Sequence, residues 1–257
     1  MELYRVENLT FTYPGQFAPA LRDVSLTLCA GEFVTLCGLS GSGKSTLLRQ
    51  LKTVLAPNGV RRGAVLFDAR PLSDVSQREQ AERIGFVQQS PENQIVTDKV
   101  WHELAFGPES LGYDTPTIRR RVAEMAGFFG MESWFHREAA SLSGGQKQLL
   151  NLAAVLTLQP DVLILDEPTA QLDPIAAADF LAALARVNRE LGTTVLLSEQ
   201  RLEEALPLSD RAVVLDGGAV LADGAPRAVG AQLRAAMDER YMRAGGKVQR
   251  VLYLSLI

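Results

Sequence analysis

Apolar residues follow two patterns along this chain: short unbroken runs, and longer stretches in which they recur every three or four positions. The short runs predict buried strands, and the longer stretches predict helices. Strands are expected at residues 32–37, 161–166 and 194–198, and helices at 44–53, 115–128, 147–156 and 177–191. Together these elements predict an α/β fold with a parallel core.

Two β-rich segments, near residues 3–8 and 24–29, precede these elements and predict a small antiparallel sheet attached to the core. The helix at 115–128 lies between the loop after Gly85–Gln89 and the strand that ends at residue 166. This order predicts an inserted helical subdomain at about 90–160.

We expect the main domain to cover residues 1–225. Residues 226–257 are predicted to form a helical and apolar extension. Its last ten residues, 248–257, are expected to pack either on the core or on a second subunit.

Composition sets limits on the class of protein. The chain has 257 residues, of which 47% are hydrophobic, and a formal charge of −4. These values predict a globular protein with a real core and no general attraction to nucleic acid. No apolar run approaches the roughly 20 residues that cross a bilayer, and the N-terminus lacks a signal-peptide layout, so a cytosolic chain is expected. Cys29 and Cys37 fall in predicted strands and are expected to be small buried hydrophobes without a redox or metal role.

A glycine-rich segment follows the first buried strand. Residues 38–46 read Gly-Leu-Ser-Gly-Ser-Gly-Lys-Ser-Thr, which fits the phosphate-binding loop G-x-x-x-x-G-K-[ST] between a strand and a helix. The glycines permit positive φ and bring backbone N–H groups close to phosphates, the lysine reaches the β- and γ-phosphates, and the serine after it can ligate Mg²⁺. A turn that matches by chance is disfavoured by the flanking elements. The predicted triphosphate ligands are Gly38, Ser40, Gly41, Ser42, Gly43, Lys44, Ser45 and Thr46.

Two adjacent carboxylates end the apolar strand at 161–166. Successive residues at a strand end point in different directions, so the two acids can have different roles. Asp166 is placed to hold Mg²⁺, and Glu167 to activate water as a general base. Taken alone, the pair is as readily explained as surface charge, but together with the phosphate loop it predicts ATP hydrolysis.

A second candidate anion site precedes this strand. Ser143, Gly144, Gly145 and Gln146 stand at the start of a predicted helix, where a hydroxyl and backbone N–H groups meet the positive end of the helix dipole. With the preceding leucine they resemble the signature motif of ATP-binding cassette (ABC) ATPases. This resemblance implies a P-loop NTPase of the ABC type, with a RecA-like mixed or parallel sheet core, an N-terminal antiparallel β subdomain and an inserted helical subdomain. It also implies a head-to-tail dimer in which this motif closes on the ATP of a second ATPase subunit.

Four further positions acquire roles from this resemblance. Tyr13 matches the aromatic residue that stacks on adenine, although by residue type alone it fits the core equally well. Gln89 matches the glutamine that helps to position Mg²⁺ and water, and neighbouring Gln88 is the less favoured alternative. Asp173 matches the loop that communicates across the dimer, although Gln171 departs from the small residue usual there. Gln200 stands where the family has a histidine near the γ-phosphate. Glutamine donates a hydrogen bond but does not become a cation, so reduced transition-state stabilisation is expected.

The segments Gln89–Val96 and Val100–Glu109 resemble the energy-coupling factor (ECF) ATPases of vitamin and transition-metal-ion importers. This resemblance implies a groove that receives a transmembrane T-component, a separate substrate-binding S-component, and a location at the cytoplasmic face of the membrane. An ordinary importer ATPase is the alternative, and the solute is not revealed by this chain. The apolar side chains at these segments are expected to be partly exposed for partner contact or else packed inside: Ile95, Val96, Val100 and Trp101.

The sequence therefore predicts an ATP-hydrolysing subunit of a membrane importer, with ATP and Mg²⁺ as cofactors. Two alternatives stay open. One is a regulatory nucleotide-binding half of an asymmetric pair, since Gln200 weakens its site while Glu167 is retained. The other is a soluble cassette ATPase outside transport. The single cassette and the absence of a strongly basic face in the sequence argue against it.

Overall fold

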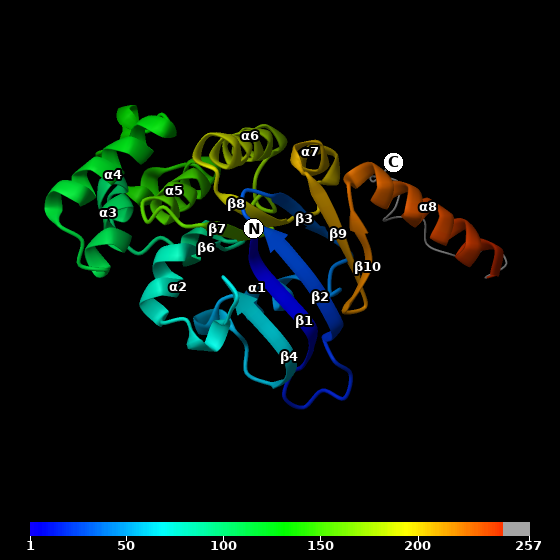
Figure 1. Ribbon diagram of the computed structural model, residues 1–257. Helices are drawn as coiled ribbons and strands as arrows, with labels where there is room; N and C mark the ends of the chain where they lie inside the picture. The colour runs from blue at the N-terminus through cyan, green and yellow to red at the C-terminus, as the bar shows by residue number, and fades with distance from the viewer. Residues whose placement is uncertain (244–257) are drawn as a thin grey trace. The chain divides into compact units, whose positions relative to one another are not determined.

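The computed structural model describes the backbone of residues 1–243 and the side chains of residues 1–234 (Figure 1). The predicted packing of residues 248–257 lies outside the described residues. The chain divides into two compact units, one formed by Met1–Val75 with the segment from Thr194 onward, and one formed by Ser76–Thr193. The predicted helical insertion at 90–160 falls within the second unit, and its limits, like the domain limit at 225, stay predictions.

The first unit contains two sheets. Its strands are β1 (Glu2–Thr12), β2 (Leu21–Cys29), β3 (Phe33–Cys37), β4 (Val60–Phe67), β5 (Arg70–Pro71), β8 (Thr194–Ser198), β9 (Arg211–Asp216) and β10 (Ala219–Gly224). Its helices are α1 (Lys44–Gln50), α7 (Leu202–Ala205) and α8 (Pro226–Arg243), with 3-10 turns at Thr53–Leu55, Leu72–Asp74 and Leu206–Leu208. One sheet has the order β2-β1-β4-β5, and in the other β3 lies between β8 and β9, with β10 beside β9.

The β1 sheet is the antiparallel sheet that the sequence predicts, because β1 pairs antiparallel with both β2 and β4. Its inner face is aromatic: the rings of Tyr4 and Phe67 lie 4.9 Å apart and both residues are almost fully buried. The Tyr4 hydroxyl donates to the Leu51 carbonyl at 2.5 Å, which ties the sheet to the end of α1. This buried polar tip is therefore satisfied, as a tyrosine in a core requires.

The β3 sheet forms the parallel core of the first unit. β3 pairs parallel with β8 and with β9, and all five of its residues are buried, as expected for a strand covered on both faces. β10 is antiparallel to β9, so the sheet is mixed. The predicted α/β class with a mixed or parallel sheet is confirmed.

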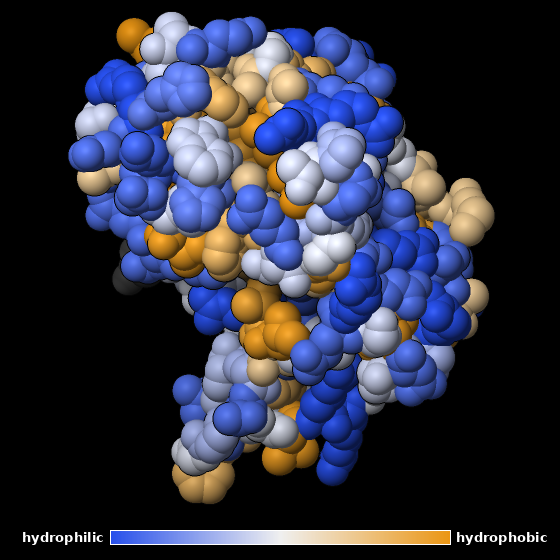
Figure 2. Space-filling view, turned by 90° about the vertical axis from the view of Figure 1, so that its left-hand side faces the viewer, coloured by the Kyte–Doolittle hydropathy of each residue, from blue (hydrophilic) through white to orange (hydrophobic). Residues whose placement is uncertain are grey.

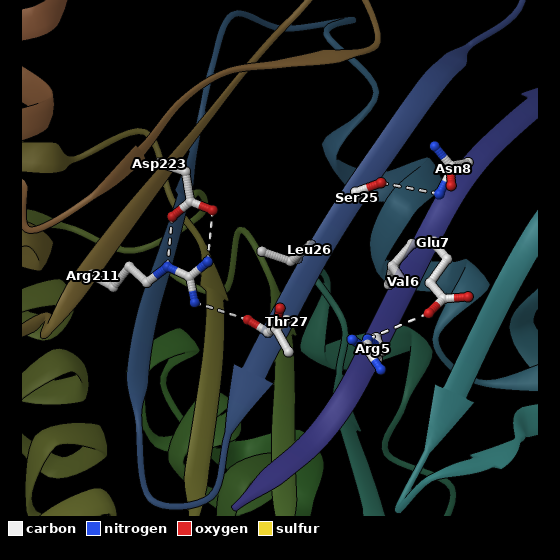
Figure 3. A pocket seen from close by; sticks show the side chains of 9 residues that line it. All are labelled: Arg5, Val6, Glu7, Asn8, Ser25, Leu26, Thr27, Arg211 and Asp223. Atoms are coloured by element: carbon white, nitrogen blue, oxygen red, sulfur yellow. Dashed lines mark hydrogen bonds and ion pairs between the residues drawn. The ribbon is translucent and has the colours of Figure 1, made fainter.

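Arg211 joins the two sheets of the first unit (Figure 3). Its guanidinium donates to both carboxylate oxygens of Asp223, at 2.5 and 2.6 Å, and to the carbonyl of Thr27 in β2 at 2.9 Å. Bidentate pairing of this kind is stronger than a single ion pair, because two parallel hydrogen bonds fix the geometry. The β9–β10 hairpin is thereby held against β2.

The second unit places helices beside a pair of parallel strands. Its elements are α2 (Gln77–Arg83), β6 (Ile84–Val87), α3 (Val100–Ser110), α4 (Thr115–Phe128), α5 (Gly144–Leu156), β7 (Val162–Asp166) and α6 (Pro174–Leu191), with 3-10 turns at Pro91–Asn93, Glu132–Trp134 and Ala139–Ser141. β6 and β7 pair parallel, in register from Ile84 opposite Val162 to Val87 opposite Leu165. α3 packs against both α4 and α5 (Figure 1).

Two burial predictions are wrong. Cys29 is exposed, because β2 alternates and the residue after buried Leu28 points to the opposite face. The apolar residues that recur along the helix predicted at 177–191 are expected to lie in the core, and four of them are buried: Ala177, Phe180, Leu184 and Val187. Leu191, which ends α6, is 46% exposed. Val100 is fully buried, so only the packed alternative holds for it. Cys37 is buried as expected, and burial raises the pKa of its thiol to about 12.

Candidate nucleotide-binding site

The phosphate loop leaves the carboxyl end of β3 and enters α1. Gly38 and Gly43 have φ values of 149° and 102°, and a Cβ at these positions would lie 2.3 Å from the Leu215 carbonyl oxygen and 2.7 Å from that of Ala20. At Gly41, with φ of 79°, a Cβ would meet no atom within 4 Å. The loop is thus packed against protein at its two ends and open at its middle, where an anion would approach.

Polar groups of the loop are buried in an arrangement that suits phosphate oxygens. Lys44 is 4% exposed as a residue, and its ammonium donates to the carbonyls of Gly38 and Leu39, at 2.9 and 3.1 Å. The Ser42 hydroxyl is buried, and within the described residues it has no hydrogen-bond partner. A buried hydroxyl without a partner is costly unless a ligand or water completes it. The loop therefore fits the predicted phosphate ligand.

Tyr13, the predicted adenine contact, lies next to the start of α1. Its hydroxyl shares a hydrogen bond of 2.9 Å with Thr46 Oγ1, and its ring meets Phe11 edge-on at 4.9 Å. Both contacts are within the first unit, so the structure brings Tyr13, Thr46 and the phosphate loop together. Stacking on adenine stays a prediction.

Gln200 lies at the same sheet edge as the phosphate loop. Leu36 of β3 is opposite Ser198 of β8 in a parallel register, so Gly38 and Gln200 each follow two residues later. The carboxylate of Glu199, only 2% exposed, accepts from the N–H groups of Gln200 and Arg201 at 2.7 and 3.1 Å. The backbone that carries Gln200 is therefore fixed at the edge where α/β sheets bind ligands.

The acidic half of the predicted site lies in the second unit, at the carboxyl end of β7. Asp166 is 6% exposed, and Glu167 is less buried and has a φ of 48°. A non-glycine residue in this left-handed region is strained, by roughly 1–3 kcal/mol, and such strain gathers at functional sites. Gln89 follows the neighbouring parallel strand β6 and is exposed, so it lies at the same edge as the two acids.

The donors predicted for Mg²⁺ are the Ser45 hydroxyl, the Gln89 amide oxygen and the Asp166 carboxylate. All are hard oxygen ligands, the chemistry that Mg²⁺ prefers when phosphates supply further ligands. Ser45 lies in the first turn of α1 and Asp166 at the end of β7. These residues therefore fit the ion. In the part of the chain that the structure describes, no group of three His, Cys, Asp or Glu side chains suggests another metal site.

The predicted signature residues form the N-terminus of α5. Ser143 is the N-cap: its hydroxyl accepts from the Gln146 N–H at 3.3 Å, while the Gln146 side chain accepts from the Ser143 N–H at 3.0 Å. This capping box orders the turn. The Ser143 proton remains available for a second acceptor, and both Ser143 and Gly144 are exposed. An anion approaching from outside would meet the hydroxyl, the N–H groups and the helix dipole.

Asp173 is the N-cap of α6, where its carboxylate accepts from the Ala176 N–H at 2.9 Å. The N-termini of α5 and α6 are in close contact, since a Cβ on Gly145 would lie 3.0 Å from that of Ala176. The signature turn and the loop before α6 are therefore packed together.

Two concave surfaces lie away from the phosphate loop. One, of about 330 Å³ in the first unit, has its charged groups paired with one another, as Arg5 is with Glu7 and Arg211 with Asp223, so we assign it no ligand (Figure 3). The other, of about 420 Å³ in the second unit, is lined by Glu92, Ile95, Thr97, Asp98, Glu138, Ala139, Ala140 and Lys147. It adjoins the segment that resembles ECF ATPases.

That segment also presents apolar side chains at the surface. Val96, Trp101 and Phe106 are 62%, 38% and 44% exposed. The face of the molecule on which α3 and α4 lie carries hydrophobic patches in a mainly hydrophilic surface (Figure 2). Glu103, which is 5% exposed, holds the loop before α3 by accepting from the N–H groups of Val96 and Thr97 at 3.1 and 2.8 Å.

Sequence reasoning missed two residues on the side of α5. Gln148 and Asn151 are 0% and 1% exposed, and their amides donate to the carbonyls of Gln88 and Pro91, each at 3.3 Å. The available signal was the presence of two amides three residues apart in an otherwise apolar stretch of helix. Buried amides of this kind must find partners, which predicts contact with an irregular backbone segment.

In this chain a phosphate loop follows one parallel strand, β3, and two acids stand at the end of another parallel strand, β7. These features define an α/β protein of the phosphate-loop, nucleotide-binding class. The family model for "ABC transporter" matches residues 21–170. The chain belongs to the ABC transporter family. Within the described residues, no helix is long and apolar enough to cross a membrane.

Curated relatives agree with this family. A "Putative ABC transporter ATP-binding protein" of Bacillus cereus is 49% identical over 224 residues, which cover 87% of this chain and 40% of the relative. A protein of the same description from Streptomyces avermitilis is 42% identical over 227 residues, again 87% of this chain and 40% of the relative. The chain thus spans about two fifths of the length of these relatives.

Solved structures with this fold include cbiO1 from Clostridium perfringens, part of the ABC transporter complex cbiONQ. It matches with a TM-score of 0.81 and 31% identity, over 95% of this chain and 97% of that one. A dimeric post-hydrolysis ATP-binding cassette bound to ADP and Pi, MJ0796, matches with a TM-score of 0.75 and 26% identity, over 87% and 98% of the two chains. These structures are cassettes of the ABC type, which confirms the predicted fold.

Proposed function

We propose that this chain binds and hydrolyses ATP and so energises a membrane importer. The observation that carries the proposal is the phosphate loop, which is open at Gly41 and holds buried Lys44 together with the Ser42 hydroxyl. Lys44 and the loop amides hold the phosphates, and Tyr13 stacks on adenine. Ser45, Gln89 and Asp166 hold Mg²⁺, which neutralises phosphate charge when bound. Glu167 accepts the proton of the attacking water.

The second phosphate contact comes from a partner ATPase subunit in a head-to-tail dimer. Ser143 donates its hydroxyl proton to the partner's triphosphate, and Gly144 and Gly145 add backbone N–H groups. Asp173 relays the state of one site to the other. The dimeric arrangement of the MJ0796 cassette supports this proposal.

The importer we propose is of the energy-coupling factor type, which carries vitamins or transition-metal ions. Its support is the likeness to cbiO1 and the 420 Å³ groove beside the exposed apolar residues of the 92–106 segment. A T-component contacts that groove at the cytoplasmic face of the membrane, and an S-component binds the solute. Nucleic acid has no role in this function.

Steady-state ATP hydrolysis by the purified chain tests the activity, with Glu167→Gln as the blank and protein concentration as the variable. A rate that rises faster than linearly with concentration, and that vanishes in the blank, is the result expected of a competent dimer. Hydrolysis equal to the blank, with no ATP binding, would refute the proposal.

A regulatory role in an asymmetric pair is the second candidate, and Gln200 favours it. It predicts ATP binding without hydrolysis by the chain alone, and hydrolysis when a sister ATPase is added. Membrane recruitment distinguishes these two candidates from a soluble cassette ATPase outside transport, which would not bind membranes. If the chain serves a membrane importer, Val96→Asp should release the tagged chain from membranes. The matched control Val54→Asp, which changes an exposed valine of the first unit, should not.

A further inference from the structure

The loop that carries Gln89 is fixed by a side-chain amide within the second unit. Gln94 Oε1 accepts from the Gln88 N–H at 3.0 Å, and Gln94 Nε2 donates to the Phe86 carbonyl at 3.0 Å. One amide group thus contacts the backbone on both sides of Val87. This is the pattern with which a residue of a parallel neighbouring strand pairs, donating to the carbonyl of one peptide and accepting from the N–H of the next peptide.

The other backbone group of Gln88 is held as well. Its carbonyl accepts from the buried Gln148 amide at 3.3 Å, and this carbonyl belongs to the peptide bond that leads directly into Gln89. The Gln89 side chain itself is exposed. The residue before it, Gln88, therefore has both its backbone N–H and its carbonyl bonded to amide side chains.

Further contacts attach the same loop to α5. Asn151 donates to the Pro91 carbonyl at 3.3 Å, and Lys147 pairs with Glu92 at 2.7 Å. Gln94 lies in sequence between Glu92 and Ile95, which line the groove of the second unit. Its amide is bonded to the backbone directly before Gln89, so it connects the groove segment with that backbone.

We propose that Gln94 is a positioning residue, which fixes the backbone from Phe86 to Gln88, directly before Gln89, and thereby sets how the Gln89 amide meets Mg²⁺ and the attacking water. The inference rests on the proposed function for its catalytic consequence, but not for the hydrogen bonds themselves. Gln94→Met keeps nearly the same side-chain size as glutamine and removes both hydrogen bonds, to the Gln88 N–H and to the Phe86 carbonyl. Gln94→Glu keeps the acceptor for the Gln88 N–H and replaces the donor with a carboxylate oxygen.

Amide hydrogen exchange tests the bonds without nucleotide. In Gln94→Met the Gln88 amide should exchange about 10-fold faster, the effect of losing one net hydrogen bond. In Gln94→Glu its protection should be largely kept. Gln77→Met, an exposed glutamine at the start of α2, is the control and should leave this amide unchanged. Unchanged exchange in Gln94→Met overturns the inference.

A double-mutant cycle tests the consequence. Gln94→Met should lower ATP turnover about 10-fold when Gln89 is present, and by less than about 2-fold in the Gln89→Ala background, because a positioning residue acts only through the group it positions. Equal losses in both backgrounds would show a merely structural role and overturn the inference. If the wild-type chain binds ATP without hydrolysing it, the regulatory candidate is favoured, and the cycle is run on the ratio of ATP affinities measured with Mg²⁺ and with EDTA.

Discussion

Ser143 performs two tasks that one substitution can separate. Its hydroxyl caps α5 in the structure, and its proton is the predicted contact with a partner's ATP. Aspartate is an equally good N-cap, and its charge is favourable at a helix N-terminus, but it has no proton to donate and repels phosphate. Ser143→Asp should therefore keep the fold and lose the function, whereas Ser143→Ala should lower stability slightly and weaken the function less than Ser143→Asp does.

The magnitudes follow from the geometry. The cap bond to the Gln146 N–H is long, at 3.3 Å, so Ser143→Ala should cost about 0.5–1 kcal/mol of unfolding free energy, the lower part of the range for caps. A unit charge placed about 4 Å from a phosphate charge near a protein surface costs about 4 kcal/mol. That energy corresponds to roughly 1,000-fold weaker ATP-dependent dimerisation.

The assay is ATP-dependent dimerisation of the hydrolysis-deficient Glu167→Gln chain, followed by molecular mass against concentration, with urea unfolding alongside. Asp114→Ala is the control, because it removes the same kind of cap from α4, where Asp114 accepts from the Thr117 N–H at 2.9 Å. It should lower stability and leave dimerisation intact. If Ser143→Asp dimerises with ATP as well as Ser143→Ala does, the N-terminus of α5 does not meet a triphosphate and the reasoning is refuted.

Three other outcomes are expected. Iodoacetamide at pH 8 should label only Cys29 in the native chain and reach Cys37 only after unfolding, because burial raises the pKa of Cys37 to about 12; two adducts in the native mass spectrum would contradict this. Burial lowers the pKa of Lys52 from 10.5 to about 8, so between these values the unfolded chain binds more protons and stability should rise with pH, by up to about 3 kcal/mol. In urea titrations, the unfolding free energy of Lys52→Met should lack that rise with pH. Parallel pH profiles for the wild type and the variant would count against this assignment. Gln200→His should raise ATP turnover by adding a group that can become a cation, and an unchanged or lower rate would argue against the role given to this position.

The elements that sequence predicts best are those with a strong local signal at both ends. α4 covers Thr115–Phe128 as predicted, and its start is marked by the Asp114 cap and by proline in the first turn. β8 covers Thr194–Ser198 as predicted. α1 is shorter than the predicted 44–53, because the chain leaves the helix at Leu51 and turns through a 3-10 segment at Thr53–Leu55. Apolar periodicity does not mark that exit.

Burial was harder to predict because it depends on neighbours that are distant in sequence. The wrong predictions for Cys29 and Leu191 concern the last residue of a strand and of a helix, where the local pattern continues but the covering element does not. Val100 shows why both alternatives had to stay open, since this apolar residue is fully buried although the tryptophan beside it is exposed. Residue type alone does not separate these cases.

The candidate site divides in the same way. Glycine, lysine and hydroxyl residues at fixed spacing identify the phosphate loop, since phosphate chemistry demands those residue types. The amides at 148 and 151 stand in an apolar stretch of helix and indicate contact with an irregular backbone segment, but the sequence does not show which segment, and Gln94 carries no such signal. Only the fold makes them partners of the same loop.

α5 now has two separable tasks. Its N-terminus carries Ser143, and its side, at Gln148 and Asn151, holds the loop of Gln89. Eight residues separate Ser143 from Asn151, about 12 Å along a helix that moves as one body. A displacement of α5 would therefore shift the signature turn and the Gln89 loop together, so the contact with a partner's nucleotide and the positioning of Gln89 are expected to change in concert. Removal of the hydrogen bond from Gln148 to the Gln88 carbonyl should uncouple the positioning of Gln89 from the contact with a partner's nucleotide. The cap at Ser143 should stay intact.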